Sequence, residues 1–187
     1  MAAGYACVAR DGMARVTVED IAREAGLARA TVYRAFPGGR DELVSAAVAH
    51  AVGDFFAGLR ADIGEVDDVV VLLERGLVAG RRRLDQHTVL QRSLRDEADR
   101  IVPELATVVP VVLDALRAEV AARLAGERLR SGVEIDEAAD LVARLTLSLI
   151  SNPGGWDTDD PDAVRRLVRD QLLAGVVDLD SRRDPGR

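Results

Sequence analysis

Apolar residues recur at helical spacing along the whole chain, and short polar, glycine or proline breaks divide the pattern into segments. After two short segments near the N-terminus, the pattern predicts helices over residues 40–61, 67–84, 87–100, 105–129, 136–151 and 162–179. Pro110 lies inside the fourth of these helices and is expected to kink it, because proline removes one backbone donor. The sequence therefore predicts an all-α protein.

The first short segment has the features of a helix N-terminus at Thr17. The Thr17 hydroxyl can accept a hydrogen bond from a free backbone N–H, and Asp20, three residues on, completes an approximate capping box. A helix is therefore predicted to begin near Val18, with Ile21 and Ala22 on its buried face.

A glycine turn and a second short helix follow. Gly26 stands one step past the first helix, where a left-handed backbone conformation costs glycine little, and Leu27 is expected to fold back onto that helix. The second helix is predicted over residues 28–35, with Val32 and Phe36 anchoring it from below and small or basic side chains pointing outward. A helix that enters the major groove of DNA needs such an outer surface, so the pair is predicted to be a DNA-binding helix-turn-helix.

At these residues the chain resembles the TetR family of bacterial transcriptional repressors. The residues that match the family's N-terminal signature are Thr17, Ile21, Ala22, Ala25, Gly26, Thr31, Val32, Tyr33, Phe36, Arg40, Asp41 and Leu43. The resemblance covers about residues 1–50 and is specific, because it joins two helices, their turn and the start of the next helix. It implies an N-terminal three-helix DNA-binding domain over residues 1–46 and a helical effector-binding and dimerisation domain over residues 47–187.

The chain departs from the family pattern in two places. Between Phe36 and Arg40 it has one residue more than the common spacing, so the basic side chain that would meet a phosphate is expected to sit slightly differently. About ten residues precede Asp11 and Gly12, where family members have a basic arm and a full first helix. The N-terminal segment is therefore expected to contact DNA more weakly than the basic arm of those family members does.

The predicted DNA contacts lie on and beside the second short helix. Its outward surface is expected to read base edges, because recognition helices approach bases near their start and an arginine fork can bind guanine through two hydrogen bonds. The residues of this surface are Arg29, Ala30 and Thr31, with Arg34 beside them. Phosphate contacts are expected from Thr17, Tyr33 and Arg40. The predicted partner is double-stranded operator DNA.

The net charge of the chain at first argues against a DNA-binding protein. The 187 residues carry a formal charge of −7, with 25 arginines and no lysine. Residues 1–60, however, hold seven arginines and seven acidic residues, whereas the other 127 residues hold 18 and 25. The acidity therefore belongs to the C-terminal part. A neutral N-terminal part can still bind phosphates where its arginines share one face, with modest non-specific affinity.

The last two predicted helices, residues 136–151 and 162–179, have apolar stripes wider than one small domain usually covers. Pairing with a second copy into a four-helix bundle is therefore predicted, with Leu145, Leu149, Leu172 and Val176 across the twofold axis. The resemblance likewise implies a homodimer through residues 136–179. Trp156, in the loop between these helices, is expected to cap this interface rather than to stack on a ligand.

The helices between residues 67 and 150 hold more apolar residues than one bundle seam needs. A ligand pocket is predicted there, and a filled core is the equally weighted alternative. The residues expected to line the pocket come from Leu73, Leu77, Leu90, Leu94, Val112, Leu116 and Leu145. The resemblance implies a small-molecule effector, and the presence of only six aromatic residues favours an aliphatic one. The predicted function is that of a repressor released from its operator by a small apolar molecule. The alternative is a helical protein–protein interaction module that has lost DNA binding.

Enzymatic functions find little support in the sequence. His50 and His87 are the only histidines, and the chain has no glycine-rich phosphate loop, zinc-binding histidine motif or nucleophile elbow, so neither catalysis nor a cofactor is expected. The aspartates between residues 157 and 162 lack the glycine and distal glutamate of a calcium loop, so no metal is expected. One cysteine, no secretory leader and no run of eighteen apolar residues predict a cytoplasmic protein without a membrane span.

Overall fold

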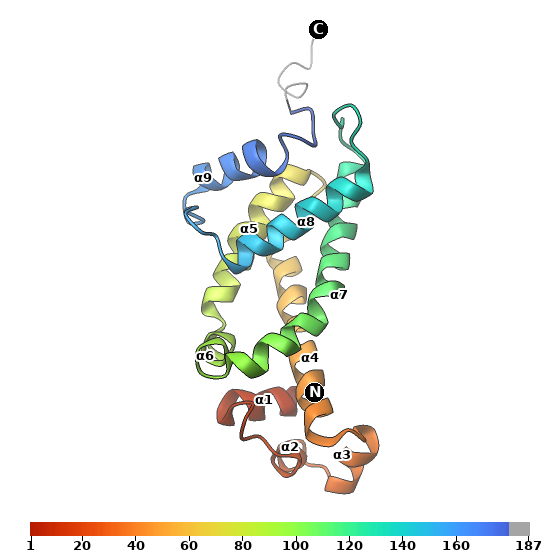
Figure 1. Cartoon of the computed structure of the whole chain (residues 1–187), viewed down its shortest axis with the longest axis vertical. Coiled ribbons are helices and arrows are strands. Elements are labelled where there is room, and N and C mark those ends of the chain that lie inside the picture. Colours follow the sequence, from red (N-terminus) through yellow and green to blue (C-terminus); the bar gives the residue numbers. More distant parts are fainter. Residues whose placement is uncertain (180–187) are drawn as a thin grey trace. The chain divides into compact units, whose positions relative to one another are not determined.

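The computed structural model describes residues 1–179, and the fold is all-α as the sequence predicts (Figure 1). The helices are α1 (Ala2–Asp11), α2 (Val18–Glu24), α3 (Arg29–Ala35), α4 (Gly39–Ile63), α5 (Val69–Gln86), α6 (Thr88–Asp96), α7 (Ala98–Leu124), α8 (Ile135–Ser151) and α9 (Pro161–Arg166), followed by a π-helical stretch, η1 (Leu167–Leu172). In the described part of the chain, β-type pairing is limited to one isolated antiparallel bridge between Leu129 and Val177.

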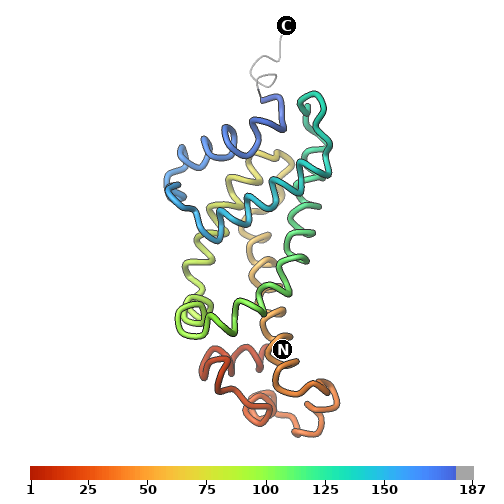
Figure 2. Tube along the Cα trace, viewed as in Figure 1, coloured from red at the N-terminus to blue at the C-terminus, as the bar shows by residue number. Residues whose placement is uncertain are grey.

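The chain forms two compact units. Unit 1 contains residues 1–58 and 87–109, and unit 2 contains residues 59–86 and the described residues from 110 onward. Along the trace in Figure 2, the chain enters unit 2 within α4, returns to unit 1 after α5 and enters unit 2 again within α7. The domain boundary expected after residue 46 divides the chain differently and stays a prediction.

The core of unit 1 is built around the helix-turn-helix segment. Ile21 of α2 and Val32 of α3 are buried together with Leu43 and Val44 of α4. By length and hydropathy, α4 is the one helix in residues 1–179 that could cross a membrane. The buried side chains of Leu43 and Val44 account for part of that apolar character.

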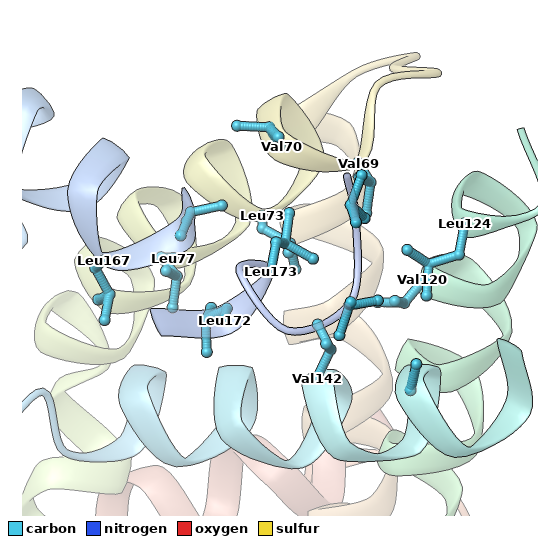
Figure 3. Packing of buried hydrophobic residues seen from close by; sticks show 14 of the residues in the cluster. Val69, Val70, Leu73, Leu77, Val120, Leu124, Val142, Leu167, Leu172 and Leu173 are labelled. Carbon is cyan, nitrogen blue, oxygen red and sulfur yellow. The ribbon is translucent and has the colours of Figure 1, made fainter. Parts of the chain in front are cut away.

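The core of unit 2 is formed by side chains of α5, α7, α8, α9 and η1 (Figure 3). Leu73 and Leu77 of α5 are 2% and 1% exposed and lie in one cluster with Val142 of α8. The two helices approach closely at Gly80 of α5, where an added Cβ would stand 2.8 Å from Cδ1 of Ile150. A side chain at position 80 would therefore overpack the contact between α5 and α8.

The break between α6 and α7 lies earlier than the sequence predicts. It was expected between residues 100 and 105 and occurs at Glu97, whose backbone carbonyl accepts from the N–H groups of Arg100 and Ile101 in the first turn of α7. Pro110 lies inside α7 without ending it. The kink expected at Pro110 stays a prediction.

The last predicted helix, residues 162–179, is shorter and less regular than expected. The α-helix ends at Arg166, and the π-helical stretch η1 continues to Leu172, with the N–H of Leu173 donating to the carbonyl of Val168, five residues back. The following segment pairs with residues 128–130, since the N–H of Arg130 donates to the carbonyl of Val176 at 3.0 Å. The same pairing explains why α7 ends near residue 124 and not near residue 129.

Two residues that the sequence places at a dimer interface are core residues of this chain. Leu172 and Val176 are 6% and 7% exposed and belong to the core of unit 2. The rest of unit 2 covers the wide apolar stripe to which they belong. These two residues therefore need no second copy of the chain to bury them. Leu149 is half-buried against the same core, whereas Leu145 is 39% exposed and Leu141 is 54% exposed. Among the four residues predicted across the twofold axis, the one that stays exposed, Leu145, is therefore on α8.

Candidate nucleic-acid interface

Thr17 caps the N-terminus of α2, as the sequence predicts. Its Oγ1 accepts from the N–H of Asp20 at 3.2 Å, and the Asp20 carboxylate accepts from the N–H of Thr17 at 3.2 Å, which completes the capping box. The Thr17 hydroxyl also donates to Asp20 at 2.5 Å and so holds the pKa of that carboxyl below its ordinary value. Thr17 thus orients the first turn of α2, and its contact with a phosphate stays a prediction.

The turn between α2 and α3 is a Schellman motif around Gly26. The N–H of Leu27 donates to the carbonyl of Ala22 at 2.9 Å, and the N–H of Gly26 donates to the carbonyl of Arg23 at 3.2 Å. Gly26 has a φ of 65°, the left-handed conformation predicted for it. The backbone of Leu27 folds back onto α2 through its hydrogen bond to Ala22, whereas its side chain is 51% exposed and its packing onto α2 stays a prediction.

Most side chains of α3 face outward. Within this helix Val32 is the one buried residue, and together with the half-buried Phe36 it anchors α3 as predicted. Among the predicted contact residues, Thr31 is half-buried and four are exposed: Arg29, Ala30, Tyr33 and Arg34. The helical repeat sets Arg29 beside Tyr33 and Ala30 beside Arg34, so the exposed surface consists of two adjacent stripes.

Two neighbouring side chains hold the guanidinium of Arg29. Its Nη1 lies 2.6 Å from Oε1 of Glu19 on α2, and its Nη2 donates to the hydroxyl of Tyr33 at 3.5 Å. The guanidinium carbon lies 5.3 Å from the centroid of the Tyr33 ring, within the range of a cation–π contact. Hydrogen bonding to Tyr33 and the charge of Glu19 raise the pKa of Arg29 above its ordinary value. The sequence pattern did not reveal the pairing of Arg29 with Glu19.

The guanidinium of Arg40 is bound by oxygen atoms of its own chain. Its Nε donates to the carbonyl of Val16 at 3.0 Å, its Nη2 donates to the carbonyl of Met13, and its Nη1 donates to Asp41 at 2.8 Å. These bonds tie the first turn of α4 to the segment before α2. These bonds make Arg40 part of the scaffold of unit 1, and its predicted contact with a phosphate stays a prediction.

The Arg40→Ala variant is expected to lower the free energy of unfolding by about 1–3 kcal/mol, because two backbone carbonyls lose a charged donor. A scaffold role without a phosphate contact predicts that the salt dependence of DNA binding stays unchanged in this variant. Chemical unfolding and a salt titration of DNA affinity measure the two quantities. Arg34→Ala, which removes an exposed arginine of α3, is the control for stability. A salt slope that falls by about one in Arg40→Ala would instead support the predicted phosphate contact.

A carboxylate far along the sequence also holds the loop after α1. Glu97 accepts from the backbone N–H groups of Met13 and Ala14, each at 2.8 Å, although these residues lie 84 and 83 positions away. Arg92 of α6 donates to the carbonyl of Val8 in α1 at 3.2 Å. These bonds explain why unit 1 includes residues 87–109 as well as the helix-turn-helix.

A charged hollow in unit 1 is lined by residues from the end of α1, from the following segment and from α2. Its volume is about 600 Å³, and its walls are formed by Arg10, Asp11, Arg15, Asp20, Arg23 and Glu24. These charges are largely paired, since Arg10 lies 2.9 Å from Glu24 and Arg23 lies 3.2 Å from Asp20. The hollow is therefore unlike the apolar pocket that the sequence predicts. Within residues 1–179, no group of three or more His, Cys, Asp or Glu side chains is placed to hold a metal ion.

The predicted effector-pocket residues are divided between the two units. Leu90 and Leu94 belong to unit 1, where Leu90 packs against the core and Leu94 is 38% exposed. The other five belong to unit 2: Leu73 and Leu77 in its core, Val112 at 9% exposure, Leu116 half-buried and Leu145 exposed. The burial of Leu73 and Leu77 in the core of unit 2 therefore agrees with the alternative of a filled core. An effector pocket stays a prediction.

Known proteins with similar sequences are transcriptional regulators. Residues 1–47 match the family model of bacterial regulatory proteins of the tetR family. An HTH-type transcriptional regulator of Mycobacterium bovis is 32% identical over 132 residues, which span 70% of this chain and 67% of the relative. The matched residues include the capped helix α2, its glycine turn and α3.

Solved structures with a similar fold include two regulators in complex with small molecules. FadR from Bacillus subtilis with stearoyl-CoA aligns with a TM-score of 0.56 and 17% identity, covering 93% of this chain and 96% of that one. SmeT, the repressor of the Stenotrophomonas maltophilia multidrug efflux pump SmeDEF, was solved with triclosan and aligns with a TM-score of 0.57 and 23% identity, covering 95% and 89%. At these identities the two structures show a shared fold.

Proposed function

The chain belongs to the TetR family of HTH-type transcriptional regulators, and from this premise we propose that it is a dimeric repressor that binds its operator through α3 and leaves it when a small apolar effector binds. Regulators of this family bind operator DNA and small-molecule ligands, and they are not enzymes. The observation that carries the proposal is the outward surface of α3, which exposes Arg29 and Arg34 while Val32 anchors the helix.

We propose that α3 enters the major groove of the operator. Arg29 is the first residue of this helix, where recognition helices approach base edges, and its guanidinium matches the two acceptors of guanine. Ala30 is small enough to allow close approach, and Thr31 lies next to it. Thr17 at the start of α2 and Tyr33 on α3 are proposed to reach the flanking phosphates.

The proposed dimer is formed through the exposed face of α8. Dimerisation is typical of the family, and Leu141 and Leu145 expose 54% and 39% of their surface on this helix. Trp156, in the loop after α8, is 40% exposed and would extend the same apolar surface. A twofold dimer presents two copies of α3 to two half-sites, about 34 Å apart in a typical operator.

The proposed effector is a small apolar molecule. Support comes from proteins of the same fold, since FadR holds stearoyl-CoA and SmeT holds triclosan in their solved complexes, and both molecules carry large hydrophobic groups. The scarcity of aromatic residues in this chain favours an aliphatic effector. Such a molecule releases DNA only when it binds more tightly to an arrangement of the dimer that no longer matches the operator.

DNA binding is tested by selection from a random-sequence duplex library with the purified protein. The proposal expects enrichment of a site with two symmetric half-sites, which then shifts in a mobility assay at lower protein concentration than an unrelated duplex. Failure to enrich any sequence, with the protein folded, would favour the interaction-module alternative.

Effector binding is tested by calorimetry with stearoyl-CoA and with stearic acid as probes, each with and without the selected operator. Because linkage is reciprocal, an inducer should lose affinity in the presence of operator by the same factor by which it weakens operator binding. Equal affinity in both titrations would remove that compound as an inducer.

A further inference from the structure

The three acidic residues of α2 have different partners, and in the described structure one of them reaches α3. Asp20 bonds to Thr17 and Arg23, and Glu24 bonds to Arg10. Glu19 instead lies 2.6 Å from Nη1 of Arg29. A carboxylate on the first helix of the helix-turn-helix thus holds the arginine that begins the second helix.

The contacts of Arg29 leave part of its guanidinium available. A guanidinium has five N–H donors, two on each terminal nitrogen and one on Nε. Glu19 and Tyr33 each engage one terminal nitrogen, so one further N–H on each of these atoms, and Nε–H, can still face a base. The side chain is 61% exposed, and Glu19 is 46% exposed, so DNA can reach the pair. The pair restrains the direction of Arg29 without using up its donors.

We propose that Glu19 is a specificity-determining residue, which holds Arg29 toward a guanine edge and keeps its guanidinium from pairing with phosphates. The inference rests on the proposed operator binding. An unrestrained arginine gains energy from phosphates at any sequence, whereas a guanine edge offers two acceptors at a fixed spacing that suits a guanidinium held in place. The carboxylate beside Arg29 also weakens attraction to phosphates. Glu19 therefore reduces binding to random DNA more than binding to the operator.

The test compares Glu19→Gln with the wild-type chain on the selected operator and on a random duplex. Glutamine keeps the size of the side chain and removes its charge. Affinity for the random duplex should rise more than affinity for the operator, so that their ratio falls about two- to fivefold, the range expected for an exposed ion pair. The salt dependence of binding to the random duplex should steepen by about one, as Arg29 gains a phosphate.

Glu24→Gln is the matched control, because it removes the same charge from the same helix but from a pair with Arg10. It should strengthen binding to both duplexes alike and leave their ratio unchanged. In an Arg29→Ala background, Glu19→Gln should behave as Glu24→Gln does. If the ratio of operator affinity to random-duplex affinity were the same in Glu19→Gln and Glu24→Gln, the inference about Glu19 would be wrong. A wild-type chain that selects no operator would instead overturn the proposed function.

Discussion

The Leu145→Glu variant is expected to be monomeric and to lose most of its operator affinity. Leu145 and Leu141 are the large apolar side chains exposed on α8. In a twofold interface the substitution places two carboxylates in an apolar surface, and desolvating charges without partners costs several kcal/mol. A monomer holds one half-site at a time, so affinity for an operator with two half-sites should fall about 10²- to 10⁴-fold. Light scattering measures the mass, and a mobility shift measures the affinity.

Leu94→Glu is the matched control for this variant, because Leu94 is 38% exposed and lies on α6. The control should remain a dimer of normal stability. Leu149→Glu is less suitable, since Leu149 is half-buried against the core of its own unit and a charge there would destabilise the fold. A clean dimer of Leu145→Glu would move the interface away from the exposed face of α8.

The Arg29→Ala variant should lose about 5- to 150-fold in affinity for the selected operator and tolerate substitution at one base pair of each half-site. The reason is that a two-pronged arginine–guanine contact discriminates one base from the others, and alanine cannot make it. Affinities for a panel of operators, each changed at one position, measure the loss position by position. The affinity for random DNA should change little, because Glu19 keeps Arg29 away from phosphates.

Arg34→Ala removes an equal charge from the same short helix and serves as the control for general electrostatics. A loss that is uniform across the operator panel is the expected pattern for a phosphate contact. If Arg29→Ala also weakened every operator variant by the same factor, base reading by Arg29 would be wrong, and α3 would need another reading residue.

The features that depend on neighbours a few residues apart could be predicted from the sequence. The capping box of Thr17 and Asp20 joins residues three apart, and the left-handed Gly26 closes a turn over a few residues. The periodicity of apolar residues placed α2, α3 and α8 within one or two residues of their observed bounds. These predictions held because helix starts, glycine turns and buried faces are set by local backbone geometry.

The tertiary structure decided what the long-range contacts control. Arg40 was expected at a phosphate, but it bonds to carbonyls 24 and 27 residues away. The break at Glu97 and the early end of the last helix likewise coincide with hydrogen bonds to distant segments, which a periodic pattern does not contain. An apolar stripe such as that of Leu172 and Val176 shows that a surface must be covered, but not whether its own chain or a second copy covers it. The sequence by itself thus determined the family, the helix-turn-helix and its exposed arginines. Packing between different segments of the chain decided the partners of Arg29 and Arg40, and it decided which part of the C-terminal apolar stripe is covered.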